Sequence, residues 1–337
     1  MSTETPRKRR RAWLIAAAVC ASAVLAGGTV ATNTDALAPD DLCDGRVSSE
    51  DAGNSLDGAG RVTGRIDNLG DCVVEQSGWL PGTEDAKVRL GARAVTPEHP
   101  FGQSEWKASG AQNILPGELP GAFDEYGNGW VALPSDCGPL GAAGAEGDHT
   151  VLSAVVEQGS ADPAELARLT RAAARELAAD HDCAPPTSPP KKAGTDLIEA
   201  SAPARSDPAE LCGLTGFTVD AEVPAGSPLR EQTSGSRDDA WFCDLSFEPP
   251  TTGLPRDEEE GASARLAIIR NATLLPAAEE RGFQHAVCDG KETYFAAELL
   301  SVRSPRTPEE KAASSFFRES DVENRFTAAA RASLGCG

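Results

Sequence analysis

Two short stretches, Pro39-Asp40-Asp41-Leu42-Cys43 and Pro208-Ala209-Glu210-Leu211-Cys212, share the pattern Pro-x-x-Leu-Cys. Each stretch opens a set of four cysteines. Successive cysteines are 29, 65 and 46 residues apart in the first set and 31, 45 and 48 residues apart in the second. Four cysteines in similar register, with matching flanking residues, indicate an internal repeat. The sequence therefore predicts two related units.

The two sets also end alike. Ala172-Ala173-Ala174-Arg175 leads to Cys183, and Ala328-Ala329-Ala330-Arg331 leads to Cys336. Between the sets, the segment 185–206 is rich in proline, and clustered prolines favour an extended spacer. A chain of 337 residues also has the length expected of about two domains. We therefore predict a first unit at 39–184, a linker at 185–206 and a second unit at 207–337.

The cysteines of the two units are predicted to form disulfide bonds. Their number is even, and no two of them show the C-x2-4-C spacing of a structural zinc site. Four cysteines allow three pairings in each unit, and we favour the sequential one. In that pairing the first bond ties an entry helix to the first central strand, and the second ties the terminal helix to the segment before the last strand. The favoured pairs are Cys43 with Cys72, Cys137 with Cys183, Cys212 with Cys243, and Cys288 with Cys336.

Alternation of apolar and polar residues predicts strands in both units, most clearly from Trp241 to Phe247. The expected strands cover 72–74, 88–90, 130–133 and 150–156 in the first unit, and 241–247, 264–269 and 294–302 in the second.

A helix is predicted at the end of each unit. Asp162 is placed to cap the first helix, Pro163 suits its first position, and Glu165 completes a capping-box pattern. Apolar residues then recur at helical spacing, at Leu166, Leu169, Ala173 and Leu177 in the first helix and at Val322, Phe326, Ala330 and Leu334 in the second. The predicted fold class is α+β, with two tandem domains that each contain a mainly antiparallel sheet with helices on one face.

The amino terminus carries five basic residues at 7–11, followed by twenty uncharged residues from Ala12 to Ala31. About 20 apolar residues span a bilayer, so 12–31 is predicted to be a transmembrane signal-anchor. The positive-inside rule places 1–11 in the cytoplasm, with a juxtamembrane segment at 32–38 and both units outside the cell. A-x-A-like sites that end at Ala31 and Ala38 leave open the alternative of secretion after cleavage.

The charge of the chain excludes one class of partner. The net charge is −21, and without the first 31 residues 26 basic and 51 acidic side chains remain, a net charge of −25. Because Lys and Arg make the contacts to phosphates, we expect no nucleic-acid partner. Four histidines and one methionine also argue against dense metal or haem sites, and we expect no metal and no cofactor.

The sequence contains no G-x-S-x-G, H-E-x-x-H or G-x-x-x-x-G-K motif, and no catalytic residue is predicted. We interpret Gly58 to Gly64 as a turn and not as a dinucleotide-binding loop. Asp124 to Gly129 is interpreted as a plain loop and not as a calcium site, and Asp257 to Glu260 as a solvated acidic loop. Asn271-Ala272-Thr273 fits a glycosylation acceptor that matters only in eukaryotic secretion. The histidines are interpreted as surface or structural side chains, at His99, His149, His181 and His285.

The basic tail, the apolar helix, the Pro-x-x-Leu-Cys starts and the Ala-Ala-Ala-Arg helices that end at a cysteine resemble exported proteins of high-GC Gram-positive bacteria. A composition of 24 arginines to 7 lysines fits such a genome. The resemblance covers most of the chain. It implies a membrane-bound or secreted module without an assigned activity, and it transfers no catalytic residue.

We therefore expect a membrane-anchored extracellular module that binds or senses a ligand or protein of the cell envelope. Duplication of a unit without catalytic residues fits binding, because two copies raise avidity without new contacts. Two alternatives remain, a secreted hydrolase with a carboxylate-based site and a structural component of the envelope. A cleft lined by carboxylates of raised pKa would favour the hydrolase, and an apolar or aromatic groove repeated in both halves would favour binding.

Overall fold

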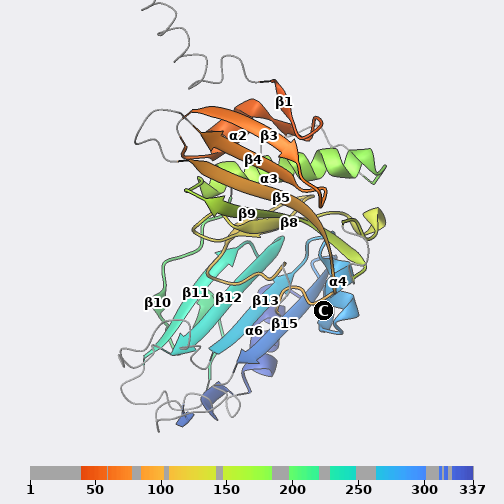
Figure 1. Cartoon of the computed structure of the whole chain (residues 1–337). Coiled ribbons are helices and arrows are strands. Elements are labelled where there is room, and N and C mark those ends of the chain that lie inside the picture. Colours follow the sequence, from red (N-terminus) through yellow and green to blue (C-terminus); the bar gives the residue numbers. More distant parts are fainter. Residues whose placement is uncertain are drawn as a thin grey trace, which may run out of the picture.

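The computed structural model describes residues 39–58, 60–77, 85–101, 106–141, 147–183, 197–219, 228–247, 263–300, 311–312, 315–317 and 321–336. In these residues the chain forms two large antiparallel sheets with few helices, which agrees with the predicted α+β class (Figure 1). The predicted membrane span at 12–31 lies outside the described residues. Among the helices within them, none is both long and apolar enough to cross a bilayer.

The first half of the chain forms a seven-stranded sheet with the strand order β3-β4-β5-β9-β8-β7-β6. Its strands are β3 (Arg61–Ile66), β4 (Cys72–Ser77), β5 (Ala86–Val95), β6 (Asn113–Leu115), β7 (Gly121–Phe123), β8 (Gly129–Ala132) and β9 (His149–Gln158). The interpretation of Gly58 to Gly64 as a turn is wrong for its second part, which belongs to β3. Gly64 pairs with Val74 of β4, and glycine is needed at this position because a Cβ would stand 2.6 Å from the Cβ of Leu42, which packs against it.

The second half forms a six-stranded sheet with the strand order β10-β11-β12-β13-β15-β14. Its strands are β10 (Ala204–Arg205), β11 (Leu229–Gly235), β12 (Ala240–Phe247), β13 (Ser263–Ile269), β14 (Gln284–Cys288) and β15 (Lys291–Leu300). The remaining elements are the ribbon of β1 (Asp41–Leu42) and β2 (Val47–Ser48), the helices α2 (Ser49–Ser55), α3 (Pro163–Asp180), α4 (Leu275–Glu280) and α6 (Val322–Ser333), and the 3-10 turns η2 (Ser135–Cys137) and η3 (Leu211–Gly213).

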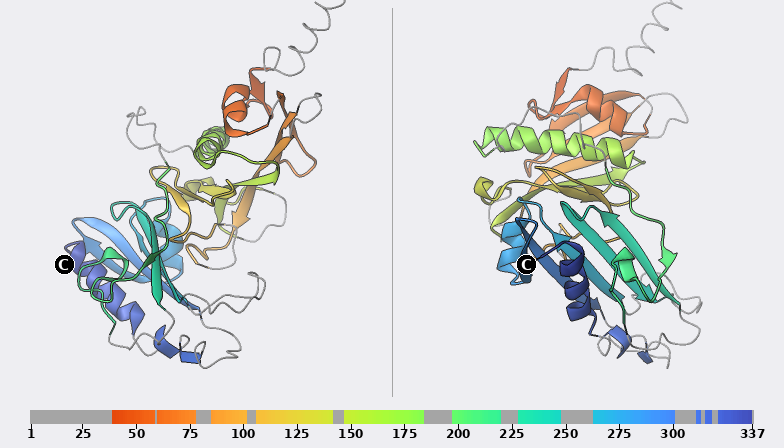
Figure 2. Two further views of the ribbon diagram at one scale, coloured as in Figure 1. Left: turned by 90° about the vertical axis from the view of Figure 1, so that its left-hand side faces the viewer. Right: turned by 180° about the vertical axis from the view of Figure 1, so that it is seen from behind.

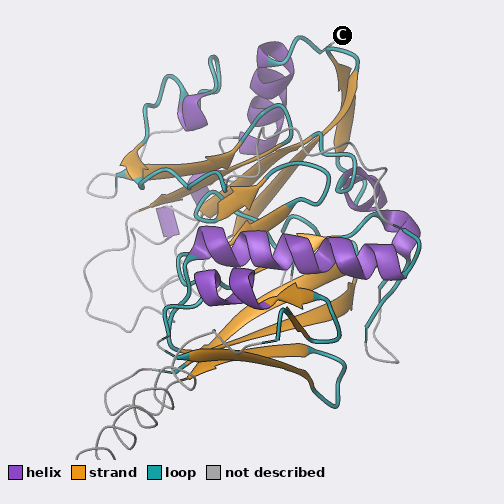
Figure 3. Ribbon diagram, turned by 90° about the horizontal axis from the view of Figure 1, so that it is seen from above, coloured by secondary structure: helices purple, strands orange, loops and turns teal. Residues whose placement is uncertain are grey.

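Helix α3 begins where the sequence predicts. The Asp162 carboxylate accepts hydrogen bonds from the backbone N–H groups of Ala164 and Glu165, both at 2.9 Å. The Glu165 carboxylate pairs with Arg168 and so does not complete the predicted capping box. The predicted apolar stripe is buried in the core of the first half, and α2 lies beside α3 over the same sheet (Figure 3). In the second half the predicted stripe of α6 is buried in the same way, with Phe326 stacked against Trp241.

The four strands next to these helices follow the same order in both halves. The row β3-β4-β5-β9 corresponds to β11-β12-β13-β15, and a terminal helix follows the last strand in each half. The register corresponds as well, because Cys72 pairs with Leu90 and Leu90 with Ala154 in one sheet. In the other sheet Cys243 pairs with Leu266 and Leu266 with Ala297. A position in one sheet can therefore be compared with its equivalent in the other.

The eight cysteines form four disulfide bonds in the sequential pairing that we favoured. The S–S distances are 1.92–2.03 Å for Cys43–Cys72, Cys137–Cys183, Cys212–Cys243 and Cys288–Cys336. The first bond of each half does not start from a helix of the predicted kind, since Cys43 follows β1 and Cys212 lies in η3. Both cysteines have a left-handed backbone, with φ of 52° and 56°. Such a conformation is uncommon outside glycine, so its occurrence at both Pro-x-x-Leu-Cys motifs is a specific similarity.

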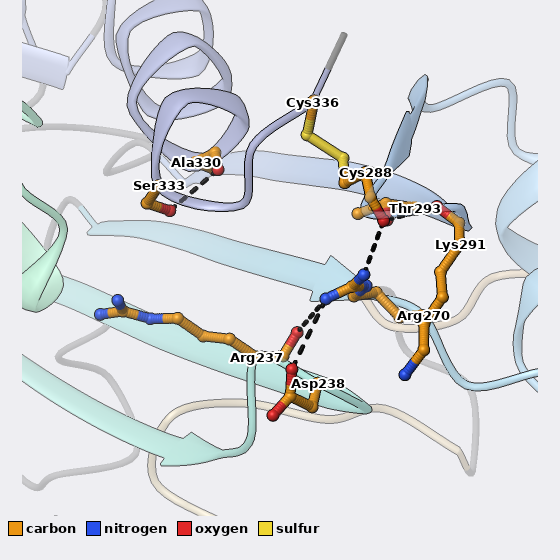
Figure 4. The surroundings of a disulfide bond; sticks show 9 residues. All are labelled: Arg237, Asp238, Arg270, Cys288, Lys291, Thr293, Ala330, Ser333 and Cys336. Carbon is orange, nitrogen blue, oxygen red and sulfur yellow. Dashed lines mark hydrogen bonds and ion pairs between the residues drawn. A yellow bond between two sulfur atoms is a disulfide. The ribbon is translucent and has the colours of Figure 1, made fainter.

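The last disulfide, Cys288–Cys336, closes the second half (Figure 4). It links the end of β14 to the segment after α6. The guanidinium of Arg270 donates a hydrogen bond of 2.8 Å to the backbone oxygen of Cys288, and its other amino group lies 3.7 Å from the Asp238 carboxylate. The side chain of Arg270 is 3 % exposed, so a buried guanidinium holds the end of β14, the edge strand of the sheet, at Cys288.

The two large sheets contact each other through an apolar cluster that we call the inter-sheet core. It combines Trp106 and Trp130 of the first half with Phe242, Ile269 and Tyr294 of the second. In two further views the sheets lie between α3 on one side and α6 on the other (Figure 2). Helix α4 also packs into the inter-sheet core, on the face of the second sheet opposite α6. The expectation that all helices lie on one face is therefore wrong for α4.

Residues 197–206 of the predicted linker take part in both sheets. Ile198 forms an antiparallel bridge with Ile114, the residue in the middle of β6. A few residues later, β10 pairs with β11 at the edge of the second sheet. Residues 184–196, which contain the proline cluster, lie outside the described residues. The segment after them is thus part of the folded structure and not a free spacer.

Candidate functional site

The candidate site is a hollow of about 260 Å³ on the face of the second sheet that carries the inter-sheet core. It lies beside that core, where the face of the sheet becomes polar. The lining residues come from the segment before β10 and from β11, β12 and β13, and they are Pro203, Arg230, Glu231, Gln232, Asp244, Ser246, Ser263 and Arg265.

Two rows of side chains across neighbouring strands form the floor of the hollow. Arg230 pairs with Ser246, and Ser246 pairs with Ser263. Two residues along each strand, and hence on the same face, a second row runs through Gln232, Asp244 and Arg265 and continues beyond the hollow to Glu298. Neighbouring strands are about 4.8 Å apart, so these side chains stand close enough to act on one ligand.

The segment before β10 builds one wall of the hollow. Ser201 accepts a hydrogen bond from the amide of Gln232 through its backbone oxygen, at 2.8 Å. Its hydroxyl accepts a second one from the backbone N–H of Thr233, also at 2.8 Å. These bonds hold Pro203 against the floor and fix the orientation of the Gln232 side chain. The predicted linker therefore supplies part of the site.

A loop from the first half contacts the other end of the floor. Gly110 lies so close to β11 that a Cβ on it would stand 2.1 Å from the backbone oxygen of Gln232. The Asp244 carboxylate faces the backbone N–H groups of Gly110 and Ala111 and the hydroxyl of Ser109. Burial raises the pKa of Asp244, and the nearby N–H and hydroxyl groups of this loop offset part of the increase. Asp244 thus joins the hollow to the first half of the chain.

Arg265 is the central cation of the floor and is only weakly engaged. Among the described residues it makes one ion pair, to the Glu298 carboxylate at 3.7 Å, and no hydrogen bond. Both side chains are 30 % exposed. A guanidinium has five N–H donors in a planar fork that matches a carboxylate, so most of the binding capacity of Arg265 is unused.

The equivalent position in the first sheet is Arg89, which pairs with Val155 and Val73 as Arg265 pairs with Glu298 and Asp244. The guanidinium of Arg89 donates hydrogen bonds to Asp67 and, at 2.5 Å, to Glu157. The bond from Arg89, with a second one from Lys87, lowers the pKa of Glu157. Two carboxylates of the same chain thus accept hydrogen bonds from Arg89, whereas its counterpart Arg265 makes none among the described residues and faces a hollow.

The structure brings together two of the histidines that the sequence places far apart. His99 and His149 both contact the ring of Trp106 in the inter-sheet core, and both are buried. His181 and His285 are exposed. This is consistent with the interpretation as surface or structural side chains. Within the described residues, no group of three or more His, Cys, Asp or Glu side chains is arranged to hold a metal ion.

Two further motifs have structural roles. The carboxylate of Asp124 accepts hydrogen bonds from the backbone of Tyr126 and Asn128 and from the Asn128 amide, so it closes its own turn, as expected of a plain loop. The amide nitrogen of Asn271 donates to the backbone oxygen of Gly117 at 2.8 Å and to Asp239 at 2.6 Å. This nitrogen is therefore engaged between the two halves and is not presented for glycosylation. Asp257 to Glu260 lie outside the described residues.

Sequence reasoning did not identify Arg230, Asp244 or Arg265 as candidate site residues. A usable pattern was present, since Asp244 and Ser246 are the polar members of the alternating stretch 241–247. The same alternation occurs around Arg89, however, and nothing in the sequence tells a covered polar row from an open one.

Comparison with protein-family models, curated proteins and solved structures finds no match to this chain.

Proposed function

We propose that the protein is a membrane-anchored extracellular binding module that holds a small polar ligand in the hollow on its second sheet. The observation that carries the proposal is Arg265. Its guanidinium lies in a concave site, makes a single long ion pair among the described residues, and has unused donors. Concave sites with a few convergent polar groups are where proteins bind small molecules, and arginine is the usual partner of an oxyanion.

The location outside the cell is supported by the cysteines and the amino terminus. Disulfide bonds persist in oxidising compartments and are rare in the cytosol, and this chain has four. The basic residues at 7–11 and the uncharged stretch at 12–31 fit an anchor that leaves both halves outside. The acidic outer portion agrees with a soluble domain that avoids anionic lipid surfaces.

Binding fits the hollow better than hydrolysis does. Two carboxylates line the hollow, but that of Glu231 accepts a hydrogen bond of 2.9 Å from the backbone N–H of Cys212, which leaves Asp244 as the single lining carboxylate without such a partner among the described residues. The lining residues include no histidine, lysine or cysteine that could activate the hydroxyl of Ser246 or Ser263. A serine hydroxyl needs such a base to act as a nucleophile.

The correspondence between the two sheets supports the proposal that the halves are copies of one unit. Strand order, register, both disulfides and the left-handed cysteines agree. In this view the first copy has lost or never acquired a ligand site, because the carboxylates of Asp67 and Glu157 accept the hydrogen bonds of its arginine, Arg89. The second copy carries the binding function.

Ligand-observed saturation-transfer NMR tests the proposal on the full-length protein in detergent micelles. The probe is a mixture of amino acids, organic acids, monosaccharides and polyamines. We expect at least one component to receive saturation from the wild type and to lose it with Ser246→Trp, which fills the hollow. Val155→Trp is the matched control, since it adds the same ring to an exposed position of the first sheet. Equal spectra for the wild type and Ser246→Trp would overturn the proposal.

A further inference from the structure

The charges along the second row of side chains, which starts in the floor of the hollow, alternate. In the row that runs across β12, β13 and β15, Arg265 stands between Asp244 and Glu298. Each carboxylate is one strand away, about 4.8 Å along the sheet. A plain anion bound to Arg265 would therefore be repelled by two carboxylates, and a plain cation bound to them would be repelled by the guanidinium.

Both carboxylates have an oxygen that lacks a hydrogen bond. Oδ1 of Asp244 and Oε2 of Glu298 are buried, and neither accepts a hydrogen bond within the described part of the chain. Oε2 of Glu298 faces the guanidinium of Arg265 at 3.7 Å, whereas no ion pair of Asp244 occurs among the described residues. Buried polar atoms are normally paired, and an unpaired one destabilises the structure. The site thus contains an acceptor without a hydrogen bond, Oδ1 of Asp244, and a guanidinium with unused N–H donors, that of Arg265.

The size of the hollow limits the ligand. Its volume of about 260 Å³ is just below the range of about 300–1,000 Å³ that is usual for drug-sized molecules. It equals the volume of about nine water molecules in the liquid. Arg230, in the parallel row with Ser246 and Ser263, adds a second cation at the same side of the floor.

We propose that the hollow binds a small zwitterion of the amino-acid type, whose carboxylate pairs with Arg265 and whose ammonium group donates to Asp244. The inference rests on the proposed function. A zwitterion places its carboxylate on Arg265 and its ammonium group on the neighbouring Asp244, so neither charge of the ligand meets a protein group of the same sign. The hydroxyls of Ser246 and Ser263 and the amide of Gln232 surround the rest of the ligand with neutral hydrogen-bonding groups.

The first sheet shows why the site is confined to the second. At the positions of Asp244 and Glu298 it carries Val73 and Val155, which accept no ammonium group. The arginine between them, Arg89, already donates hydrogen bonds to the carboxylates of Glu157 and Asp67. Arg89 is therefore a matched control for Arg265, with the same residue type at the equivalent strand position.

Saturation-transfer NMR with four probes tests the proposal on the full-length protein in detergent micelles. The probes are alanine, alaninamide without the carboxylate, N-acetylalanine without the ammonium group, and the dipeptide alanyl-alanine. We expect alanine or the dipeptide to bind and both blocked analogues to bind at least about tenfold more weakly, since hydrogen bonds to charged groups are lost. Arg265→Gln should weaken binding by a similar factor, and Arg89→Gln should leave it unchanged.

The outcomes separate this inference from the proposed function. Binding of alanine assigns a free amino acid, and binding of the dipeptide alone assigns the end of a peptide. Equal binding of alaninamide or N-acetylalanine, still abolished by Ser246→Trp, would overturn the zwitterion and leave the proposed function standing. Loss of binding with Arg89→Gln but not with Arg265→Gln would also overturn it. If neither these probes nor the solute mixture responds to Ser246→Trp, both proposals fail.

Discussion

Acidification is expected to destabilise the protein through His99, whose side chain is fully buried in the inter-sheet core. Its Nδ1 lies 3.0 Å from the backbone oxygen of Trp106, and because a carbonyl only accepts, Nδ1 carries the proton. Nε2 has no hydrogen-bond partner within the described residues. A second proton would put an unsolvated charge beside the rings of Trp130 and Phe242.

Burial, more than the nearby His149, lowers the pKa of His99 from 6.5 to about 4. Below pH 6.5 the unfolded chain therefore binds more protons than the folded one, so the free energy of unfolding falls as the pH falls. One pKa unit corresponds to 1.36 kcal/mol, which gives a loss of about 2 kcal/mol between pH 7 and pH 5 and about 3 kcal/mol by pH 4.

Urea unfolding at pH 7 and pH 5, followed by tryptophan fluorescence, measures this loss. His99→Asn keeps an N–H donor for the Trp106 oxygen but does not titrate. It is expected to be about 1–3 kcal/mol less stable than the wild type at pH 7, because part of a buried ring is removed. Its free energy of unfolding is expected to change between the two pH values by about 2 kcal/mol less than that of the wild type.

Comparison of the two proteins at both pH values removes the contribution of other groups. Asp244 is one of them, since its pKa is raised by burial and acts in the opposite direction. His181→Asn, at the exposed end of α3, is the matched control and should keep the pH dependence of the wild type. If His99→Asn loses as much stability on acidification as the wild type does, the buried histidine is not the cause and the argument is refuted.

Three further changes test the packing. Gly110→Ala places a methyl group against the backbone oxygen of Gln232 and should lower the free energy of unfolding by about 1–3 kcal/mol in the same urea assay; unchanged stability would show that the loop does not approach β11 so closely. Asp162→Ala removes the cap of α3 and should lower the free energy of unfolding by about 1 kcal/mol. The melting temperature, followed by the circular dichroism of the helices, should fall accordingly. Replacement of both Cys43 and Cys72 by alanine removes a disulfide between cysteines 29 residues apart and should lower the free energy of unfolding by about 3–4 kcal/mol, because the unfolded chain gains entropy. A stability equal to that of the wild type would contradict this expectation.

Much of the second sheet could be predicted from local patterns. The stretch from Trp241 to Phe247 alternates because one face of β12 meets α6, and the Asp162-Pro163 pair marks the start of α3. The short strands β6 and β7 could not be found in this way, since three residues are too few to show a period. Gly64 misled the interpretation because the reason for the glycine is a contact with Leu42, which lies in another element.

The candidate site was beyond local patterns for a related reason. Arg89 and Arg265 both occupy polar positions of alternating strands. What separates them is whether acids from elsewhere in the chain reach the guanidinium, and the partners of Arg89 lie 22 and 68 residues away in the sequence. One wall of the hollow comes from the segment around 203, and the loop around 110 packs against Gln232 and Asp244 of the floor. Only the folded chain brings these segments to β11.

Each disulfide joins two cysteines that follow one another directly along the chain. If the chain crosses a membrane in sequence order after the anchor, the first cysteine of each pair reaches an oxidant before its own partner, which is the next cysteine to follow. The four bonds can then form in order of emergence, without a later exchange between thiol and disulfide. The same arrangement leaves the two halves covalently independent apart from the backbone. A single protease cut between 184 and 196 would leave two separate chains that only non-covalent contacts hold together, among them the inter-sheet core, the bridge between Ile198 and Ile114 and the hydrogen bond of Asn271 to Gly117.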